Sequence, residues 1–379
     1  MTGGGSVGEA LRAAVDGLRA AGVESPRLDA ELLLAEAAGL ERARLIAAPE
    51  AELEPAAARR FGELVRRRLR REPVSQILGR KGFRRLELAV DRRVLTPRPE
   101  TELLVEVALE RRPRRALDVG TGSGAIALAL ADELPSCEVV ATDASAAALE
   151  VARANAARLG LAERVRFFVG TLPGEAGGGG EGSDGEAFDL VLANLPYVPE
   201  PEWERLPPEV REWEPREALV AGADGLDAYR ALLPRLRPRP NRPAPAPAPP
   251  RAVEVRVDVR DKAQPRSMEG GAAADVVEVG AAARDEAQPP GDEAQPPGDE
   301  AQPLRDGARQ LRDEAQPPGV GGGVVAAAVA VEVGVGQAAA VAEMMRAAGF
   351  EAVETRRDLA GIERVVVGTA GAGPGEAAG

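Results

Sequence analysis

Residues 116–130 read Ala-Leu-Asp-Val-Gly-Thr-Gly-Ser-Gly-Ala-Ile-Ala-Leu-Ala-Leu, an apolar strand pattern that passes through three glycines into an apolar helix pattern. Glycines at a strand-to-helix turn let a ligand approach the backbone, and they leave the amides of the helix N-terminus free to bind it. The spacing of Gly120, Gly122 and Gly124 differs from the dinucleotide pattern, although that pattern also tolerates an alanine at the position of Ala125. The turn therefore predicts a nucleotide-like ligand without deciding between a dinucleotide and another one.

Two acidic residues near this turn narrow the choice of ligand. Asp118 precedes the first glycine by two residues, where an anion disfavours a pyrophosphate and suits an ammonium-bearing ligand, such as the methionine part of S-adenosylmethionine. Asp143 ends the next strand pattern, where a carboxylate can accept both ribose hydroxyls, although the same side chain could cap the following helix. Leu172 follows the third strand, where we expect an adenine ring. The predicted cofactor site comprises Gly120, Thr121, Gly122, Ser123, Gly124, Asp143, Leu172 and Asn194.

Strand and helix patterns alternate from residue 115 onward. The strand patterns lie at 116–119, 139–142, 165–169 and 188–193, and the helix patterns lie at 124–133 and 144–159. Such alternation is typical of an α/β fold, in which helices cover both faces of a parallel sheet. Near the carboxyl end, the patterns predict a buried strand at 324–333, a helix at 337–348, and an edge hairpin formed by 350–355 and 364–367.

The remaining patterns divide the chain into segments. Residues 1–72 predict a small helical domain, with a last helix at 55–71, and residues 73–95 predict a β-hairpin linker with strands at 74–78 and 86–90. The α/β domain then comprises 96–238 and 319–370, with a flexible glycine-rich loop at 177–185. Residues 239–318 contain repeats of the form Asp-Glu-Ala-Gln-Pro-Pro-Gly. Their paired prolines exclude a continuous helix, so we expect a disordered insertion.

The composition excludes several kinds of chemistry. The chain of 379 residues has no histidine and one cysteine, Cys137, which rules out imidazole bases, intramolecular disulfides and cysteine-based zinc clusters. A net charge of -13 argues against a general polyanion binder, and the seven arginines between Arg59 and Arg71 are interpreted as a solvated helix face. No segment has the ~20 apolar residues of a membrane span, and the N-terminus lacks a signal-peptide pattern. We therefore expect a cytoplasmic protein.

The strand pattern Phe188–Ala193 ends in four residues that suit a flat group bearing an NH2. Asn194 offers a carboxamide oxygen as acceptor, and Leu195, being followed by Pro196, is steered into an extended conformation that can turn its carbonyl toward the same donor. The Tyr197 ring can cover a planar group. The same tetrapeptide also occurs as an ordinary strand-to-turn exit. The predicted catalytic residues are Asn194, Leu195, Pro196 and Tyr197.

Taken together, these features resemble the class I S-adenosylmethionine-dependent methyltransferases. More narrowly, the chain resembles the release factor glutamine methyltransferases, the HemK or PrmC family. The narrower resemblance is carried by residues 72–79, 96–102, 193–197, 222–226 and 358–364. Its most specific parts are the segment Arg98-Pro99-Glu100-Thr101 and the helical N-terminal domain.

This resemblance implies a fold and a reaction. The fold is a Rossmann-like, doubly wound sheet of seven mostly parallel strands with an antiparallel edge hairpin, preceded by a small helical domain that recognises the substrate. The reaction is methyl transfer from S-adenosyl-L-methionine to the side-chain amide nitrogen of the glutamine in the Gly-Gly-Gln motif of peptide chain release factors. Asn194 and the Leu195 carbonyl would accept the two N–H bonds of that amide. The expected protein is a monomer that needs no metal and binds neither nucleic acid nor membrane.

One position of the motif departs from the family pattern Asn-Pro-Pro-Tyr, because Leu195 stands where the family has proline. The carbonyl is retained, but the fixed φ is lost and an N–H is gained, so we expect reduced but real activity. Two other functions stay open at this point. A nucleic-acid adenine N6 methyltransferase would use a similar motif on an exocyclic NH2. A decayed methyltransferase core would instead act as an interaction protein through its repeats.

Overall fold

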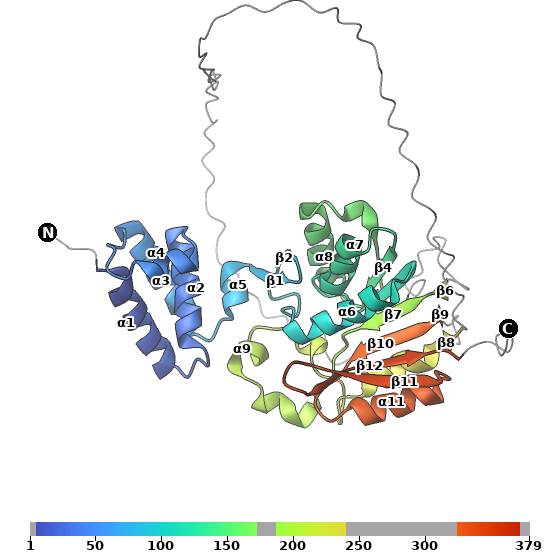
Figure 1. Ribbon diagram of the computed structural model, residues 1–379. Helices are drawn as coiled ribbons and strands as arrows, with labels where there is room; N and C mark the ends of the chain where they lie inside the picture. Colours follow the sequence, from blue (N-terminus) through green and yellow to red (C-terminus); the bar gives the residue numbers. More distant parts are fainter. Residues whose placement is uncertain (1–4, 173–186, 240–323, 372–379) are drawn as a thin grey trace, which may run out of the picture. The chain divides into compact units, whose positions relative to one another are not determined.

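The computed structural model describes residues 5–172, 187–239 and 324–371. Its largest sheet has seven strands in the order β11-β12-β10-β7-β3-β4-β5 (Figure 1). These are β3 (Arg115–Val119), β4 (Glu138–Asp143), β5 (Val165–Val169), β7 (Leu190–Ala193), β10 (Ala328–Glu332), β11 (Ala352–Arg357) and β12 (Glu363–Thr369). Six of them point in the same direction, and β12 is reversed, because it is antiparallel to both of its neighbours, β10 and β11. The predicted α/β fold with an antiparallel edge hairpin is confirmed.

The order of the strands reverses at β3. Strands β4 and β5 lie on one side of it, and β7 and β10 lie on the other. Loops that leave the carboxyl ends of strands on the two sides of such a point diverge and leave a crevice between them. The glycine turn follows β3 and Asn194 follows β7, so both predicted motifs lie at this crevice.

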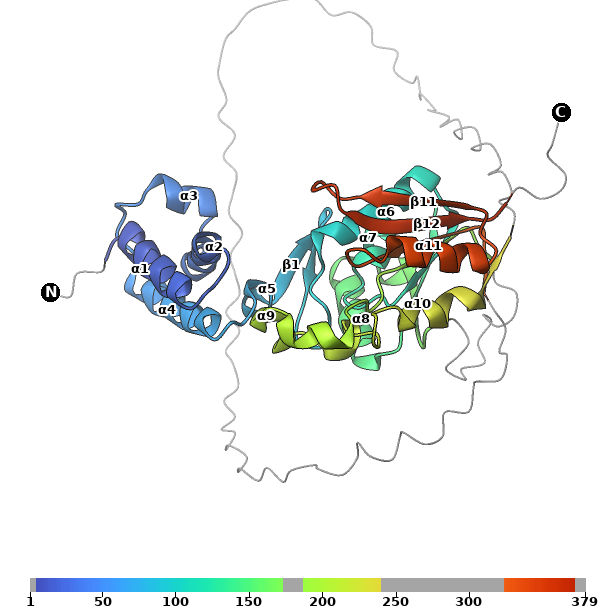
Figure 2. The same ribbon diagram turned by 90° about the horizontal axis from the view of Figure 1, so that it is seen from below.

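Helices cover both faces of the sheet (Figures 1 and 2). One face carries α6 (Glu102–Arg111), α7 (Ala125–Glu133) and α8 (Ala146–Arg158), and the other carries α10 (Asp227–Leu232) and α11 (Ala338–Ala347). The pleat of β7 divides its side chains between the two cores, since Leu190 and Leu192 pack with α6 and α7. Val191 and Ala193 pack with α10 and α11 instead. A strand buried on both faces is typical of a parallel sheet.

The N-terminal helices have an apolar core of their own. They are α1 (Val7–Ala20), α2 (Pro26–Ala38), α3 (Arg42–Ala47) and α4 (Pro55–Leu69). Leu18, Leu33 and Leu34 are fully buried between them. At the start of α1, the Ser6 side chain accepts a hydrogen bond from the Glu9 amide and the Glu9 carboxylate accepts one from the Ser6 amide, which satisfies two amides at the helix end.

The arginine-rich helix α4 is less exposed than the sequence suggested. Arg68 is 5% exposed. Its guanidinium pairs with Asp29 at 2.7 Å and with Glu209 of the short helix α9 (Pro208–Arg211) at 2.7 Å. Arg71 donates to the same Glu209 carboxylate at 2.7 Å. The interpretation of this run as a solvated face is therefore wrong for Arg68, because carboxylates far along the chain neutralise it.

The start of the predicted hairpin linker is helical. Residues Val74–Leu78 form α5, not a strand. Pro73 occupies the N-cap position of this helix, and Gly79 ends it in the left-handed conformation with φ 70°. A proline before and a glycine after a short apolar run are helix boundaries, and this signal outweighs the β-branched residues inside it. The hairpin follows as β1 (Arg80–Phe83) and β2 (Leu86–Ala89), paired antiparallel.

Two predicted strands are each divided into two. The run 324–333 forms β9 (Val324–Ala326) and β10, and the run 188–193 contributes to β6 (Ala187–Phe188) and β7. Strand β9 lies between β6 and β8 (Leu236–Pro238) in a separate sheet of three strands. At the second division, the Asp189 carboxylate accepts hydrogen bonds from the amides of Arg114 and Arg115, at 2.8 and 3.1 Å. The Asp189 backbone still bonds to both neighbouring strands, through the Arg115 carbonyl and the Ala328 amide.

Some expectations lie outside the described residues. The predicted insertion at 239–318 falls there almost entirely, and so does the glycine-rich loop at 177–185. Within the part of the chain that the structure describes, no helix is both long and apolar enough to cross a membrane.

Candidate active site

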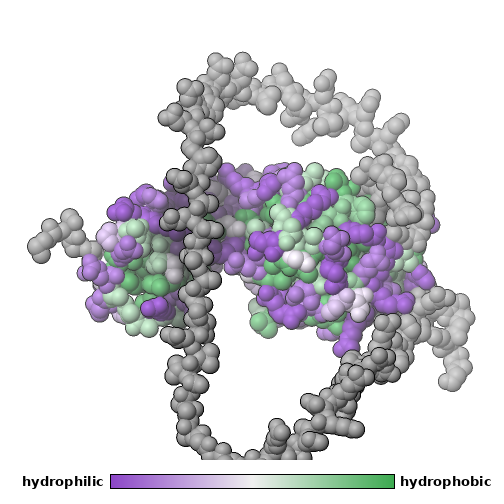
Figure 3. Space-filling model, turned by 90° about the horizontal axis from the view of Figure 1, so that it is seen from above, coloured by the Kyte–Doolittle hydropathy of each residue, from purple (hydrophilic) through white to green (hydrophobic). Residues whose placement is uncertain are grey.

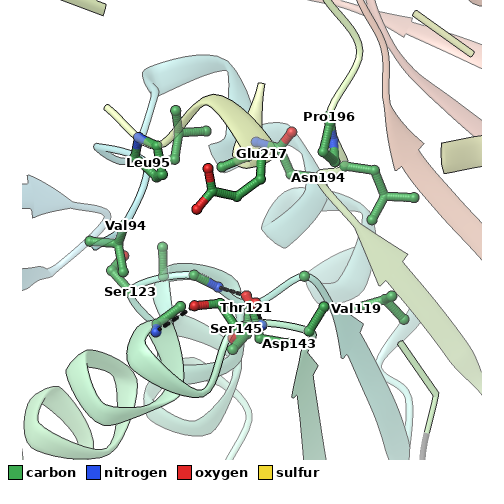
Figure 4. Close-up of a pocket in the computed structure, with 18 of the residues that line it drawn as sticks. Val94, Leu95, Val119, Thr121, Ser123, Asp143, Ser145, Asn194, Pro196 and Glu217 are labelled. Atoms are coloured by element: carbon green, nitrogen blue, oxygen red, sulfur yellow. Dashed lines mark hydrogen bonds between the residues drawn. The ribbon is translucent and has the colours of Figure 1, made fainter. Parts of the chain in front are cut away.

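A cavity of about 500 Å³ opens at the carboxyl ends of β3, β4 and β7. It brings together most of the residues that the sequence predicted (Figure 4). Those that line it are Gly120, Thr121, Gly122, Ser123, Asp143, Asn194, Leu195 and Pro196. Gly124, Leu172 and Tyr197 are not among the lining residues.

The three glycines of the turn serve different purposes. Gly120, Gly122 and Gly124 have φ values of 75°, 56° and 86°, a conformation that residues with a Cβ rarely adopt. A Cβ at Gly122 would meet no protein atom within 4 Å, so open space adjoins this backbone. A Cβ at Gly124 would lie 2.9 Å from Cδ1 of Leu128. Gly124 is therefore needed for packing of α7 and not for contact with a ligand.

Asp143 lies beside this turn at the end of β4. Its Oδ2 accepts a hydrogen bond from the Gly122 amide and its Oδ1 accepts one from the Ser145 amide, each at 2.8 Å. Burial raises the pKa of the carboxyl, and these two hydrogen bonds oppose the shift. The helix that follows is capped by Ser145, whose Oγ accepts from the Ala148 amide at 3.1 Å. Asp143 is thus not the N-cap, and it remains a lining residue of the cavity.

Asp118 does not reach the cavity. Its side chain is fully buried, and its Oδ2 accepts hydrogen bonds from the Thr121 hydroxyl at 2.6 Å and the Ala127 amide at 3.1 Å. These bonds fix the glycine turn to the first turn of α7. Burial raises the pKa of Asp118 to about 7. Asp118 is not among the residues that line the cavity; its Oδ2 holds the glycine turn, and its Oδ1 has no hydrogen-bond partner among the described residues.

Leu172 is also displaced from its predicted role. It is 1% exposed and packs in the apolar core on the α10 and α11 face. The preceding residues, Gly170 and Thr171, line the cavity instead. Thr142 holds this segment, because its hydroxyl donates to the Thr171 carbonyl at 2.8 Å.

Asn194 is held by a residue that lies far from it in sequence. Its Nδ2 donates to Oγ1 of Thr101 at 3.0 Å. Its Oδ1 is buried and has no hydrogen-bond partner among the described residues. Because a buried acceptor without a partner is costly, this oxygen is a binding group for a donor that comes from outside the chain.

The comparisons with known proteins agree with this geometry. Residues 9–79 match the family model of the PrmC N-terminal domain, and residues 116–213 match that of a methyltransferase domain. A release factor glutamine methyltransferase of Caulobacter vibrioides is 45% identical over 232 residues, which cover 60% of this chain and 78% of that protein. The proteins of the same name from Moorella thermoacetica and Geobacter sulfurreducens are 47% and 45% identical, over 60% and 56% of this chain and 78% and 72% of those proteins.

This chain belongs to the release factor glutamine methyltransferase family. It is a methyltransferase, as the sequence predicted.

In this methyltransferase, Leu195 occupies the second position of the motif Asn194-Leu195-Pro196-Tyr197, where the family pattern has proline. It is 8% exposed and packs in the apolar core beneath the site. Its substitution for proline therefore adds an apolar side chain to the core, in addition to freeing the backbone.

Tyr197 lies at a second, smaller cavity. This cavity measures about 180 Å³ and shares Asn194, Leu195 and Arg98 with the first. Burial raises the pKa of Tyr197 to about 12, so the phenol stays neutral. Its backbone carbonyl accepts from Nε2 of Gln337 at 2.9 Å. The motif Asn194–Tyr197 of this methyltransferase therefore lies between the two cavities, and Asn194 and Leu195 line both of them.

Sequence reasoning missed the segment that closes the site of this methyltransferase. Val94, Leu95, Pro97, Arg98 and Thr101 all line the larger cavity. A signal was available, because Arg98-Pro99-Glu100-Thr101 is among the most specific parts of the family resemblance. On the opposite wall, the Glu217 carboxylate projects into the space between Asn194 and the glycine turn (Figure 4).

Proposed function

We propose that this protein transfers a methyl group from S-adenosyl-L-methionine to the side-chain amide nitrogen of the glutamine in the Gly-Gly-Gln motif of peptide chain release factors. The curated relatives bear the name of this reaction and share up to 47% of their aligned residues with the chain. The adenine N6 and decayed-core alternatives find no support among these relatives.

The observation that carries the proposal is the buried Oδ1 of Asn194, which has no partner among the described residues. It faces two adjoining cavities, and Leu195 lines both as well. Within the described part of the chain, the Leu195 carbonyl accepts no hydrogen bond. A primary carboxamide has two N–H bonds to donate, and these two oxygens can accept one each. The pair therefore matches a glutamine side chain.

The larger cavity fits S-adenosylmethionine. Its cationic residues are neutralised within the protein, since Arg98 pairs with Glu214 at 2.6 Å and Arg93 pairs with Asp91 at 2.6 Å. Asp143 and Glu217 are left as anionic groups on its wall. A ligand that carries a sulfonium and an ammonium group is favoured by such a balance. The Gly122 backbone and Asp143 would hold the ribose side of it. When bound, this cofactor supplies a methyl group that is already activated.

The protein's remaining contribution is to orient the amide and to exclude water. An amide nitrogen is a weak nucleophile because its lone pair is delocalised. Two acceptors in fixed positions hold the NH2 group in one plane and leave the face above it directed at the methyl group. Leu95, Leu195 and Pro196 make the surrounding wall apolar, which keeps water from the reacting nitrogen.

We further propose that residues 1–72 recognise the release factor and that 96–238 with 319–370 carry out the transfer. Large apolar side chains are exposed on the N-terminal helical domain, and Figure 3 shows hydrophobic residues there bordered by hydrophilic ones. They are Leu28, Leu40, Ile46 and Leu69, exposed by 43%, 38%, 42% and 38%. Exposed apolar groups of this kind favour a protein partner over a nucleic acid. The protein would act in the cytoplasm as a monomer.

Mass spectrometry of a purified release factor tests the function. After incubation with this protein and S-adenosylmethionine, we expect a gain of one methylene on the glutamine of the Gly-Gly-Gln motif. Asn194→Ala should abolish the gain, whereas Glu343→Gln, a change on the exposed side of α11, should leave it intact. Methylation of RNA or DNA without methylation of the release factor would overturn the proposal.

A further inference from the structure

Glu332 is a buried carboxylate that the proposed reaction has not yet used. It is the last residue of β10 and is only 2% exposed. Its Oε2 has no hydrogen-bond partner among the described residues. The Tyr229 hydroxyl donates to its backbone carbonyl at 2.6 Å, which fixes the end of the strand. Because a buried carboxylate is costly, its presence at this point requires a reason.

The register of the sheet places Glu332 beside Asn194. Strands β10 and β7 are parallel neighbours, and Val331 pairs with Ala193. The next residue of each strand is therefore Glu332 on one side and Asn194 on the other. Side chains alternate along a strand, and both residues follow one that packs on the α10 and α11 face. Both side chains consequently emerge on the face of α6.

Thr101 lies on this face, immediately before α6, and interacts with both residues. Its Oγ1 accepts a hydrogen bond from Nδ2 of Asn194 at 3.0 Å. A hydrogen bond from its hydroxyl to Glu332 favours the ionised form of that carboxylate. A hydroxyl has one proton to donate, so donation to Glu332 leaves only lone pairs toward Asn194. The Asn194 amide must then present its NH2 group to Thr101 and its oxygen elsewhere.

We propose that Glu332 is a positioning residue that orients the Thr101 hydroxyl and thereby keeps the Asn194 side-chain oxygen directed at the substrate amide. This inference rests on the proposed function. Without the carboxylate, Thr101 can donate its proton to the Asn194 oxygen. The Asn194 carboxamide can then rotate so that its oxygen and its NH2 group exchange places. The site would then offer a donor where the glutamine NH2 needs an acceptor.

The arrangement depends on the charge of Glu332. Burial raises its pKa to about 7, and Glu100 adds to that rise while Arg364 and Arg98 oppose it. Tyr197 and Tyr229 also face this carboxylate, and both phenols stay neutral. A protonated Glu332 can donate to Thr101 and reverse the hydrogen bonds. We therefore expect turnover to rise with pH through the neutral range.

Matched substitutions separate this role from a structural one. Thr101→Val and Glu332→Leu remove the two hydrogen-bonding groups, and we expect each to lower kcat about 10- to 100-fold. In Glu332→Leu the affinity for S-adenosylhomocysteine, measured by calorimetry, should change less than about twofold, because Glu332 is not among the residues that line the larger cavity. Thr101→Ser keeps the hydroxyl and should restore most of kcat, whereas Glu332→Gln carries an NH2 donor, as the protonated carboxyl carries an OH, and should not. Thr355→Val, on the exposed edge strand, serves as the control for the threonine substitution.

A second measurement needs no turnover. The side-chain NH2 signals of Asn194 in a nitrogen-15 NMR spectrum, assigned by their loss in Asn194→Ala, should shift with pH and with a midpoint near 7. In Glu332→Gln they should not shift, even though Asp118 also titrates near this pH. The double variant Thr101→Val/Glu332→Leu should lose no more activity than Thr101→Val alone.

Several results would overturn the inference. These are an unchanged kcat in Thr101→Val, additive losses in the double variant, or an Asn194 titration that persists in Glu332→Gln. Failure of the proposed function looks different, because the wild-type protein would then not methylate the release factor at all. In that case the NMR titration still decides whether Glu332 controls the orientation of Asn194.

Discussion

Leu195 packs directly against the glycine turn, since a Cβ added to Gly120 would lie 3.3 Å from Cδ2 of Leu195. The same Cβ would lie 3.5 Å from the Asn194 carbonyl. The loop that carries the proposed catalytic residues and the turn predicted to hold the cofactor are therefore in contact. A substitution in the loop therefore alters the packing of the glycine turn, and a substitution in the turn alters the packing of the loop.

Replacing Leu195 with the proline of the family pattern should raise the activity and lower the stability of the protein. Proline fixes φ and removes the N–H, so we expect kcat to rise a few fold. The leucine side chain is lost from the core, which should lower the free energy of unfolding by about 1–3 kcal/mol. Release factor methylation and thermal unfolding measure the two effects. An inactive wild-type protein with an active Leu195→Pro variant would show that the leucine disables the enzyme.

Gly122→Ala and Gly39→Ala form a pair that tests the cavity. Both glycines have positive φ, 56° and 63°, and a Cβ at either would meet no protein atom within 4 Å. Each substitution should therefore cost a similar backbone strain of about 1–2 kcal/mol in unfolding experiments. Only Gly122 lines the cavity, so only Gly122→Ala should weaken binding of S-adenosylhomocysteine. Equal affinities in the two variants would contradict the assignment of this cavity.

Asp118→Asn should alter how stability depends on pH. Burial raises the pKa of Asp118 from 3.8 to about 7 in the folded protein. Between these two pH values, the folded state holds a proton that the unfolded state has released. The stabilisation from this group is therefore complete below pH 3.8 and is lost as the pH rises through 7. The variant lacks this titration. Between about pH 5 and about pH 8, the unfolding free energy of the wild type should fall by about 1–3 kcal/mol relative to that of the variant.

Arg68→Ala should destabilise the protein strongly. The substitution leaves Asp29 and Glu209 without the guanidinium that lies 2.7 Å from each. Removing one partner of a buried ion pair typically costs about 3–5 kcal/mol. Arg19→Ala breaks an exposed pair with Asp16 and should cost less than about 1 kcal/mol. Denaturant titration compares the two, and similar losses would show that burial does not set the strength of these pairs.

Local patterns predicted the elements whose signals are complete within a few residues. The strand at Val165–Val169 was predicted with its observed bounds because an apolar run and its flanking turns define it. Residues Val74–Leu78 were predicted as a strand because their side chains favour one, but the proline and glycine at the two ends decided for a helix. The capping signal was present in the sequence and was given too little weight.

The site was predictable where the chemistry belongs to one segment. Asn194 and the glycine turn were predicted because each follows its own strand, and both line the same cavity. Thr101 was missed, although it orients Asn194, because the two residues lie 93 positions apart and no local pattern connects them. Leu172 was placed in the site by its distance from a strand end, yet that distance does not say which face of the sheet a side chain meets.

The pairing of β8 with β9 has a consequence for chain engineering. Residue Leu236 lies beside Val324, and Pro238 lies beside Ala326. The end of β8 at 238 and the start of β9 at 324 are therefore close together in space. We expect a short crossover linker between Arg239 and Val324 to preserve the enzyme, and the same junction could carry a second folded protein in place of residues 240–323.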